Sequence, residues 1–229
     1  MFNKIFLFLF LIFMLISYKF IKRESFGNLN SDIKKVCNQL YLEKKNKKIV
    51  VIRNFLTEKQ CDNIIKEAID YADIHGWTCK RHNKYPTTDN KFMNTWKNYN
   101  CVEEKVKDIL FRKLTKMFKV NKKYLGINEI FVAKYHMNGQ TDLKYHRDGS
   151  EFSFIISLNN DYDGGGTYFD KNKKLYKLEK GDCLLFSGQN RHCGKPIKSG
   201  ERYILTGFLN HGGRYTCQEY IKKLINKKN

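Results

Sequence analysis

Three side chains of types that ligate metal ions occur at spacings that suit a single metal centre. His146 and Asp148 form a His-x-Asp pair, and His192 follows 44 residues after Asp148. In an extended segment, side chains two residues apart point to the same side, so this imidazole and this carboxylate converge. Two histidines and one carboxylate with open coordination positions are typical of non-haem Fe(II) oxygenases, and zinc accepts the same ligands. The pattern therefore predicts a centre that holds iron or zinc.

An arginine after the second histidine suits a binding site for an organic acid. Arg202 lies ten residues after His192, at the start of a predicted strand over 202–208. A guanidinium binds a carboxylate through two parallel hydrogen bonds, and a buried arginine needs such a partner because an unpaired buried charge is costly. Beside iron, the expected partner is the distal carboxylate of a keto acid. The alternative is a structural salt bridge with an Asp or Glu of the chain.

Together these residues resemble the 2-oxoglutarate/Fe(II)-dependent dioxygenase superfamily, and within it the prolyl 4-hydroxylases and procollagen lysyl hydroxylases. The resemblance covers residues 49–210. Further similar segments are the start of the domain at 54–56, a Pro-Thr-x-Asp sequence at 86–89, the strand at 131–135 before the metal motif, and a Gly-rich turn and strand at 163–169. The spacing between Tyr135 and His146 and the presence of Arg202, where many prolyl enzymes carry lysine, are more similar to the lysyl branch.

The resemblance implies a function and a set of cofactors. His146, Asp148 and His192 would hold Fe(II), and Arg202 and Tyr135 would bind the co-substrate 2-oxoglutarate. The implied reaction hydroxylates a lysyl or prolyl side chain of a protein or peptide, consumes O₂ and converts 2-oxoglutarate to succinate. The branch also implies ascorbate as a cofactor. Halogenases of the superfamily lack the metal-binding carboxylate, so Asp148 favours hydroxylation.

Two other functions remain as alternatives. The formal net charge of +20 suggests a nucleic-acid demethylase of the same superfamily. That branch resembles a pattern with a second arginine six residues after the first, and here the position is Phe208. The lysines are also scattered among asparagines along the chain, so nucleic acid is not the expected partner. The third alternative is a jelly-roll binding protein without catalysis.

The periodicity of the sequence predicts an α+β domain. A capping box at 57–60 begins one helix, an apolar face predicts a second over 102–118, and a loop spans 76–100. A short β-branched run at 49–52 and alternating segments near 129–137, 151–159, 166–170, 181–187 and 202–210 predict strands. This order suits a double-stranded β-helix, the cupin-like jelly roll, with N-terminal supporting helices.

The N-terminus precedes this domain as a separate segment. The run Ile5–Tyr18 carries no charge and has lysines on both sides, which predicts a short single-pass membrane anchor, with a signal peptide as the alternative. The side of the membrane is left open, and the endoplasmic reticulum is one candidate membrane. The expected organisation is an anchor or signal segment at 1–24, a linker or helix at 25–48, the dioxygenase domain at 49–212 and a basic tail at 213–229. No pattern specifies an oligomeric state.

For the cysteines and the other histidines we expect structural roles or exposed positions. The seven cysteines include no Cys-x-x-Cys pair, which argues against a structural zinc site and leaves one bridge, such as Cys79 with Cys101, open. Four further histidines are expected to be structural or exposed: His75, His82, His136 and His211. Asp89 in the long loop either lines a substrate groove or caps the loop.

Overall fold

The structure is a computed structural model that describes residues 48–82, 84–118 and 120–211. These residues all belong to one compact unit, Leu42–Arg214. The predicted anchor at 1–24, the linker up to residue 47 and the basic tail at 213–229 lie outside the described residues. Within the described ranges, no helix is both long and apolar enough to cross a membrane.

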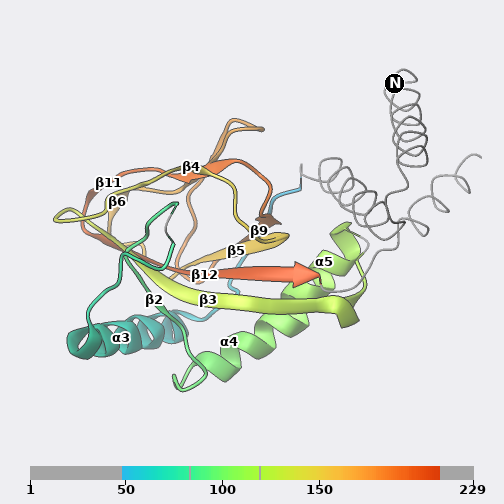
Figure 1. The fold of residues 1–229 in the computed structure, drawn as a ribbon, viewed down its shortest axis with the longest axis horizontal. Helices are drawn as coiled ribbons and strands as arrows, with labels where there is room; N and C mark the ends of the chain where they lie inside the picture. The colour runs from blue at the N-terminus through green and yellow to red at the C-terminus, as the bar shows by residue number, and fades with distance from the viewer. Residues whose placement is uncertain (1–47, 83, 119, 212–229) are drawn as a thin grey trace, which may run out of the picture. The chain divides into compact units, whose positions relative to one another are not determined.

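A six-stranded antiparallel sheet forms the larger layer of the domain (Figure 1). Its strands in spatial order are β1 (Val50–Ile52), β9 (Cys183–Ser187), β5 (Phe152–Ser157), β12 (Glu201–His211), β3 (Leu125–His136) and β2 (Asp89–Lys91). The longest ladder joins β12 to β3 and places Arg202 opposite Tyr135. These two long central strands run side by side through the middle of the view in Figure 1.

A smaller sheet faces the larger one. It contains β4 (Leu143–His146), β10 (His192–Gly194), β7 (Thr167–Phe169) and β8 (Lys174–Tyr176), and a separate pair joins β11 (Ile197–Ser199) to β6 (Asp163–Gly164). A buried apolar cluster lies between the layers and includes Phe131, Ile155, Phe169, Phe186 and Ile204. Two facing antiparallel sheets around such a core form the predicted jelly roll.

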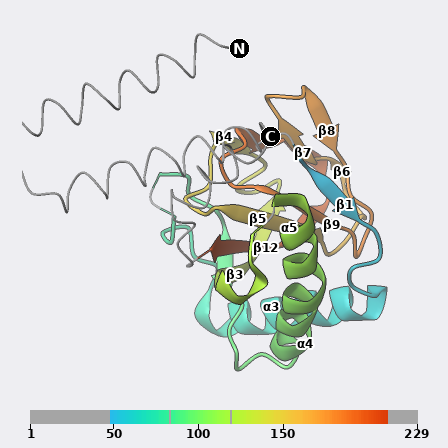
Figure 2. The same cartoon turned by 90° about the vertical axis from the view of Figure 1, so that its right-hand side faces the viewer.

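Helices cover the outer face of the larger sheet, the face away from β4 (Figure 1). Helix α3 (Glu58–His75) begins at the predicted capping box, where the Gln60 backbone N–H donates to the Thr57 hydroxyl and the Thr57 N–H donates to the Gln60 side chain. In Figure 2 it runs across the direction of α4 (Tyr99–Lys105) and α5 (Phe111–Phe118). The thiol of Cys61 on α3 lies 3.9 Å from the Ser157 carbonyl oxygen on β5, so this helix packs directly on the sheet.

The second predicted helix is continuous but contains a π-helical segment, η1 (Val106–Leu110), between α4 and α5. Besides Phe111, five of its side chains recur at every fourth residue and are almost fully buried: Val102, Val106, Leu110, Leu114 and Phe118. An α-helix has about 3.6 residues per turn, so a repeat of four drifts by about 40° at each step. The wider π turn offsets that drift and keeps the stripe on one side.

The longer predicted strands are confirmed, and several short ones appear only in the structure. Strands β1, β3, β5, β7, β9 and β12 correspond to the predicted segments, whereas β2, β4, β6, β8, β10 and β11 contain two to four residues each. The 76–100 loop is interrupted by β2 and ends where α4 begins. Cys79 and Cys101 are free thiols, so the possible bridge between them is absent from the described part of the chain.

Candidate metal and co-substrate site

The two predicted histidine ligands lie directly opposite each other on neighbouring strands. His146 is the last residue of β4 and His192 is the first residue of β10, and the antiparallel register pairs their Cα positions. Their ring centroids are 4.2 Å apart. The Asp148 Oδ1 atom lies 3.4 Å from the Nε2 atom of His146 and 3.8 Å from that of His192. One ligand atom from each residue therefore lies within 4.8 Å of the others, close enough to share one metal ion.

Both imidazoles are oriented in the same way by the backbone. The Nδ1 atom of His146 is 2.8 Å from the Lys144 carbonyl oxygen, and that of His192 is 2.8 Å from the Asn190 carbonyl oxygen. A carbonyl can only accept, so each Nδ1 carries a proton, and in the neutral ring Nε2 is then the atom with the lone pair. Burial also lowers the pKa of His192, against the opposing effect of the Asp148 charge, which keeps this ring neutral. Neutral imidazoles with free Nε2 lone pairs are the form that binds a divalent metal.

The carboxylate of Asp148 is held in its ionised form by its neighbours. Burial would raise its pKa, but the hydrogen bond with His146, the proximity of His192 and a 2.5 Å hydrogen bond from the Ser153 hydroxyl lower it below the usual range. Ser153 in turn shares a 2.8 Å hydrogen bond with Ser150, and the Asp148 backbone N–H donates to the Gly188 carbonyl. Ser153, on β5, thus fixes the carboxylate from behind, a role that no sequence motif indicates.

Arg202 is buried without an anionic partner. Only 3% of its surface is exposed, and its Nε atom has no hydrogen-bond acceptor. No carboxylate within residues 48–82, 84–118 and 120–211 forms an ion pair with it, so the alternative of a structural salt bridge is wrong for this part of the chain. The guanidinium lies 5.2 Å from the centre of the Tyr135 ring and 5.9 Å from that of Tyr162. An unpaired buried cation costs several kcal/mol, so this site is built for an anion.

Tyr135 completes the same region of the cavity. It lies opposite Arg202 in the β3–β12 ladder and is 3% exposed. Burial raises the pKa of its phenol more than the nearby Arg202 charge lowers it, so the hydroxyl stays protonated at neutral pH. A neutral phenol next to a guanidinium offers a second hydrogen-bond donor to a bound carboxylate.

A single cavity of about 630 Å³ contains all five predicted site residues: His146, Asp148, His192, Arg202 and Tyr135. Its floor is apolar and includes Phe131, Ile155, Phe186 and Ile204, and its mouth is formed partly by a loop with Lys84 and Tyr85. A cavity of this size accommodates a small co-substrate together with one side chain of a second substrate.

A buried carboxylate fixes the loop at the mouth. The Asp89 side chain is fully buried, forms an ion pair with Arg81 at 3.0 Å and accepts a hydrogen bond from the Thr87 hydroxyl. Asp89 does not line the cavity, so of its two predicted roles the structure supports the fixing of the loop. The result is that Tyr85 lies beside the metal ligands, with its ring 5.1 Å from that of His146.

One of the four histidines expected to be structural also reaches the cavity. His82 lines the cavity wall, packs on Phe131 at 5.0 Å between ring centroids, and lies 3.6 Å from Asp89 Oδ2. It belongs to no cluster of potential metal ligands, because within the described part of the chain the only such cluster is His146, Asp148 and His192. His82 is therefore a wall residue and not a metal ligand.

Comparisons of the sequence find procollagen lysyl hydroxylases among the relatives. No protein-family model matches the chain. Over 96 residues, or 39% of this chain and 11% of the relative, it is 38% identical to a procollagen lysyl hydroxylase and glycosyltransferase of Acanthamoeba polyphaga mimivirus. Over 174 residues, or 67% of this chain and 22% of the relative, it is 28% identical to human procollagen-lysine,2-oxoglutarate 5-dioxygenase 2. The chain thus spans about a fifth or less of the length of these relatives.

Comparisons of the structure show the fold. The viral collagen prolyl hydroxylase of Paramecium Bursaria Chlorella virus-1, solved as its 2OG complex, aligns with a TM-score of 0.56 and 23% identity over 71% of this chain and 96% of that protein. A prolyl-4-hydroxylase of Pseudomonas putida aligns with a TM-score of 0.59 and 15% identity over 77% of this chain and all of that protein (100%).

We expect Ser153→Ala to weaken metal binding without removing a ligand. The substitution deletes the hydrogen bond that orients Asp148, and loss of such an outer contact typically costs about 10- to 100-fold in metal affinity. Fe(II) affinity is measured anaerobically by competition with a chelator. Ser199→Ala, at an exposed position on β11, is the matched control. An unchanged affinity in Ser153→Ala would show that the carboxylate holds its position unaided.

Proposed function

We propose that this chain, which matches the 2-oxoglutarate/Fe(II)-dependent dioxygenases in sequence and fold, hydroxylates a lysyl or prolyl side chain of a protein or peptide and converts 2-oxoglutarate to succinate. The observation that carries the proposal is the pairing, in one cavity, of a His-Asp-His cluster with a buried arginine that forms no ion pair with any carboxylate of the described ranges. A zinc hydrolase would need the three ligands but has no use for the arginine.

The residues of the site fit the metal and the co-substrate. His146, Asp148 and His192 would hold Fe(II) through two neutral imidazoles and one ionised carboxylate, and leave one side of the metal open. When bound, the iron supplies the activation of O₂. Arg202 would bind the distal carboxylate of 2-oxoglutarate, and the Tyr135 hydroxyl would donate to the same group. The apolar floor excludes water around these polar groups, which strengthens their interactions with the co-substrate.

The mouth of the cavity supplies the binding site for the second substrate. Tyr85 and the loop fixed by Asp89 lie beside the metal ligands, so they would position the target side chain above the metal. Positioning of a reactive centre by rigid neighbours is the main contribution that such a protein makes to the rate. Asp148 is present in the metal site, which supports hydroxylation as the outcome.

The structure weighs against both alternatives. In place of the second arginine of the nucleic-acid demethylases, Phe208 packs on Phe131 at 5.4 Å between ring centroids and lines the cavity. A binding protein without catalysis has no reason to maintain an oriented metal triad and an unpaired buried cation, since the cation costs stability.

We also propose that residues 1–24 attach the chain to a membrane. The support is the uncharged apolar run Ile5–Tyr18 with lysines at both ends. The full chain is expected to float with liposomes, and a chain of residues 25–229 is expected to remain in the soluble fraction. Flotation of both chains to the same extent would contradict the proposal.

The purified chain with Fe(II) and O₂ should release succinate from 2-oxoglutarate, and His146→Ala or Asp148→Ala should abolish this release because each removes a metal ligand. Mass spectrometry of collagen-like peptides after incubation identifies the target: hydroxylation adds one oxygen to lysine or to proline. Lys113→Gln, at an exposed position on α5, is the control and should leave the activity unchanged. Tight zinc binding without iron-dependent turnover would contradict the proposed reaction.

Arg202→Ala should raise the KM for 2-oxoglutarate by roughly 30-fold or more, because loss of one partner of a buried charge pair typically costs at least 2 kcal/mol. The effect is measured from succinate release at increasing 2-oxoglutarate. Fe(II) affinity should stay near that of the unaltered chain, since Arg202 is not a metal ligand. An unchanged KM would show that the co-substrate binds elsewhere.

A further inference from the structure

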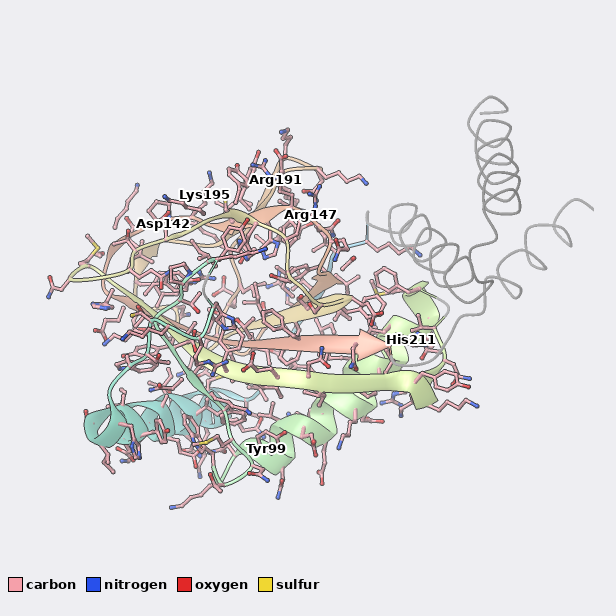
Figure 3. All side chains as sticks on the ribbon, viewed as in Figure 1. Tyr99, Asp142, Arg147, Arg191, Lys195 and His211 are labelled. Atoms are coloured by element: carbon pink, nitrogen blue, oxygen red, sulfur yellow. The ribbon has the colours of Figure 1, made fainter. Side chains whose placement is uncertain are left out.

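The mouth of the cavity has a strong excess of positive charge. Three cationic residues line it in addition to the buried Arg202: Lys84, Arg147 and Arg191. Asp148 is the only carboxylate among the lining residues, and it belongs to the metal site. Figure 3 shows Arg147 and Arg191 on the side of the molecule where β4 lies, away from the helices. A substrate segment that enters the cavity must therefore pass cationic side chains.

Two of these cations have no carboxylate partner within the described part of the chain. Lys84 is exposed on the loop fixed by Asp89 and forms no ion pair there. Arg147 donates from Nε to the Gln189 carbonyl oxygen at 3.0 Å, which fixes the side chain but leaves its charge uncompensated. Arg191 differs, because it pairs with Asp170 at 3.1 Å, and Asp170 also binds Lys173.

We infer that the substrate is a peptide segment with acidic residues next to the hydroxylated residue, and that Lys84 and Arg147 select for them. The inference rests on the proposed function, because it names the substrate class of the same site. Acidic side chains beside the target would compensate both free charges at the mouth, while a lysine- or arginine-rich segment would meet charges of its own sign.

The aromatic residues of the same surface favour a peptide over a nucleic acid. Single-stranded nucleic acids bind to cationic grooves in which aromatic faces are free to stack on bases. Here the Arg191 guanidinium lies 4.4 Å from the centre of the Tyr145 ring, and the Lys195 ammonium lies 4.7 Å from that of Tyr168. The two tyrosines also pack edge to face at 6.2 Å. One face of each of these two rings is therefore already covered by a cation of the chain.

The test compares two synthetic peptides of equal length that share the same central target residue, one flanked by glutamates and one by lysines. Binding to the full chain is measured by fluorescence anisotropy, and peptide-dependent succinate release gives KM and kcat. We expect the glutamate peptide to bind at least fivefold more tightly, and the difference to shrink as salt is added. Succinate release without peptide reports on the proposed reaction independently of the peptide sequence.

The variants assign the selectivity to the two residues. Lys84→Gln and Arg147→Gln should each weaken binding of the glutamate peptide by roughly two- to fivefold, the value of one exposed ion pair, and the change should fall on KM. Lys84→Glu should move the preference towards the lysine peptide. Lys113→Gln removes the same charge at a distant position, and it should change neither the binding of the glutamate peptide nor the preference between the two peptides. Fe(II) affinity is measured for Arg147→Gln, because this residue lies between two metal ligands.

The outcomes separate the two proposals. Equal binding of both peptides, or a preference that persists in Lys84→Glu, overturns the inference whether or not 2-oxoglutarate is consumed. Selective binding without any succinate release leaves the inference standing and contradicts the proposed reaction. The remaining outcome is a single-stranded oligonucleotide that competes with the bound peptide more tightly than the glutamate peptide itself does. If Lys84→Gln abolishes that competition, the inference is overturned, and the mouth of the cavity binds phosphate groups instead.

Discussion

The antiparallel pairing of β4 with β10 determines the geometry of the whole site. It places His146 and His192 opposite each other, although 45 residues separate them along the chain. Each Nδ1 atom lies against the carbonyl oxygen two residues earlier in its own segment, so the pairing brings the rings together and local backbone contacts orient them. Asp148 follows two residues after β4, where the Gly188 carbonyl and the Ser153 hydroxyl hold it. The relative positions of the two histidine ligands are therefore set by the pairing of these strands, before any metal binds.

The larger sheet adds the charge that distinguishes this site from a simple metal centre. The β3–β12 ladder buries Arg202 and Tyr135 as neighbours across the two strands. Among the residues that the structure describes, no carboxylate pairs with this guanidinium, so none there competes with an incoming carboxylate. The chain therefore maintains a costly buried charge in its free form, and the bound co-substrate would remove that cost.

The sequence predicts the site more completely than the elements that carry it. His146, Asp148, His192, Arg202 and Tyr135 all line one cavity as expected. The strands β4 and β10 were not predicted, because three or four residues are too few to show a period of two. Ser153 could not be identified either, since a serine on a buried strand carries no signal for the partner it binds. The loop that places Tyr85 beside the metal ligands could not be predicted either. Its position depends on the burial of Asp89, which is a property of the tertiary structure and not of the local sequence.

The π-helical segment between α4 and α5 has a consequence for how this helix tolerates change in length. Five apolar residues share one line against the sheet only because the wide turn over Val106–Leu110 absorbs the mismatch between a spacing of four and the α-helical pitch. Removal of one residue within this turn would let it close into an ordinary α-helical turn, and the side chains beyond it would stay on the same face, because a π turn holds one residue more than an α turn. Removal of a residue from α4 has no such compensation: it would rotate everything beyond it by about 100°. Phe118 would then lose its contact with Phe152 of β5, the strand next to the one that carries Arg202. This helix is therefore expected to tolerate a one-residue deletion inside Val106–Leu110 and not in α4.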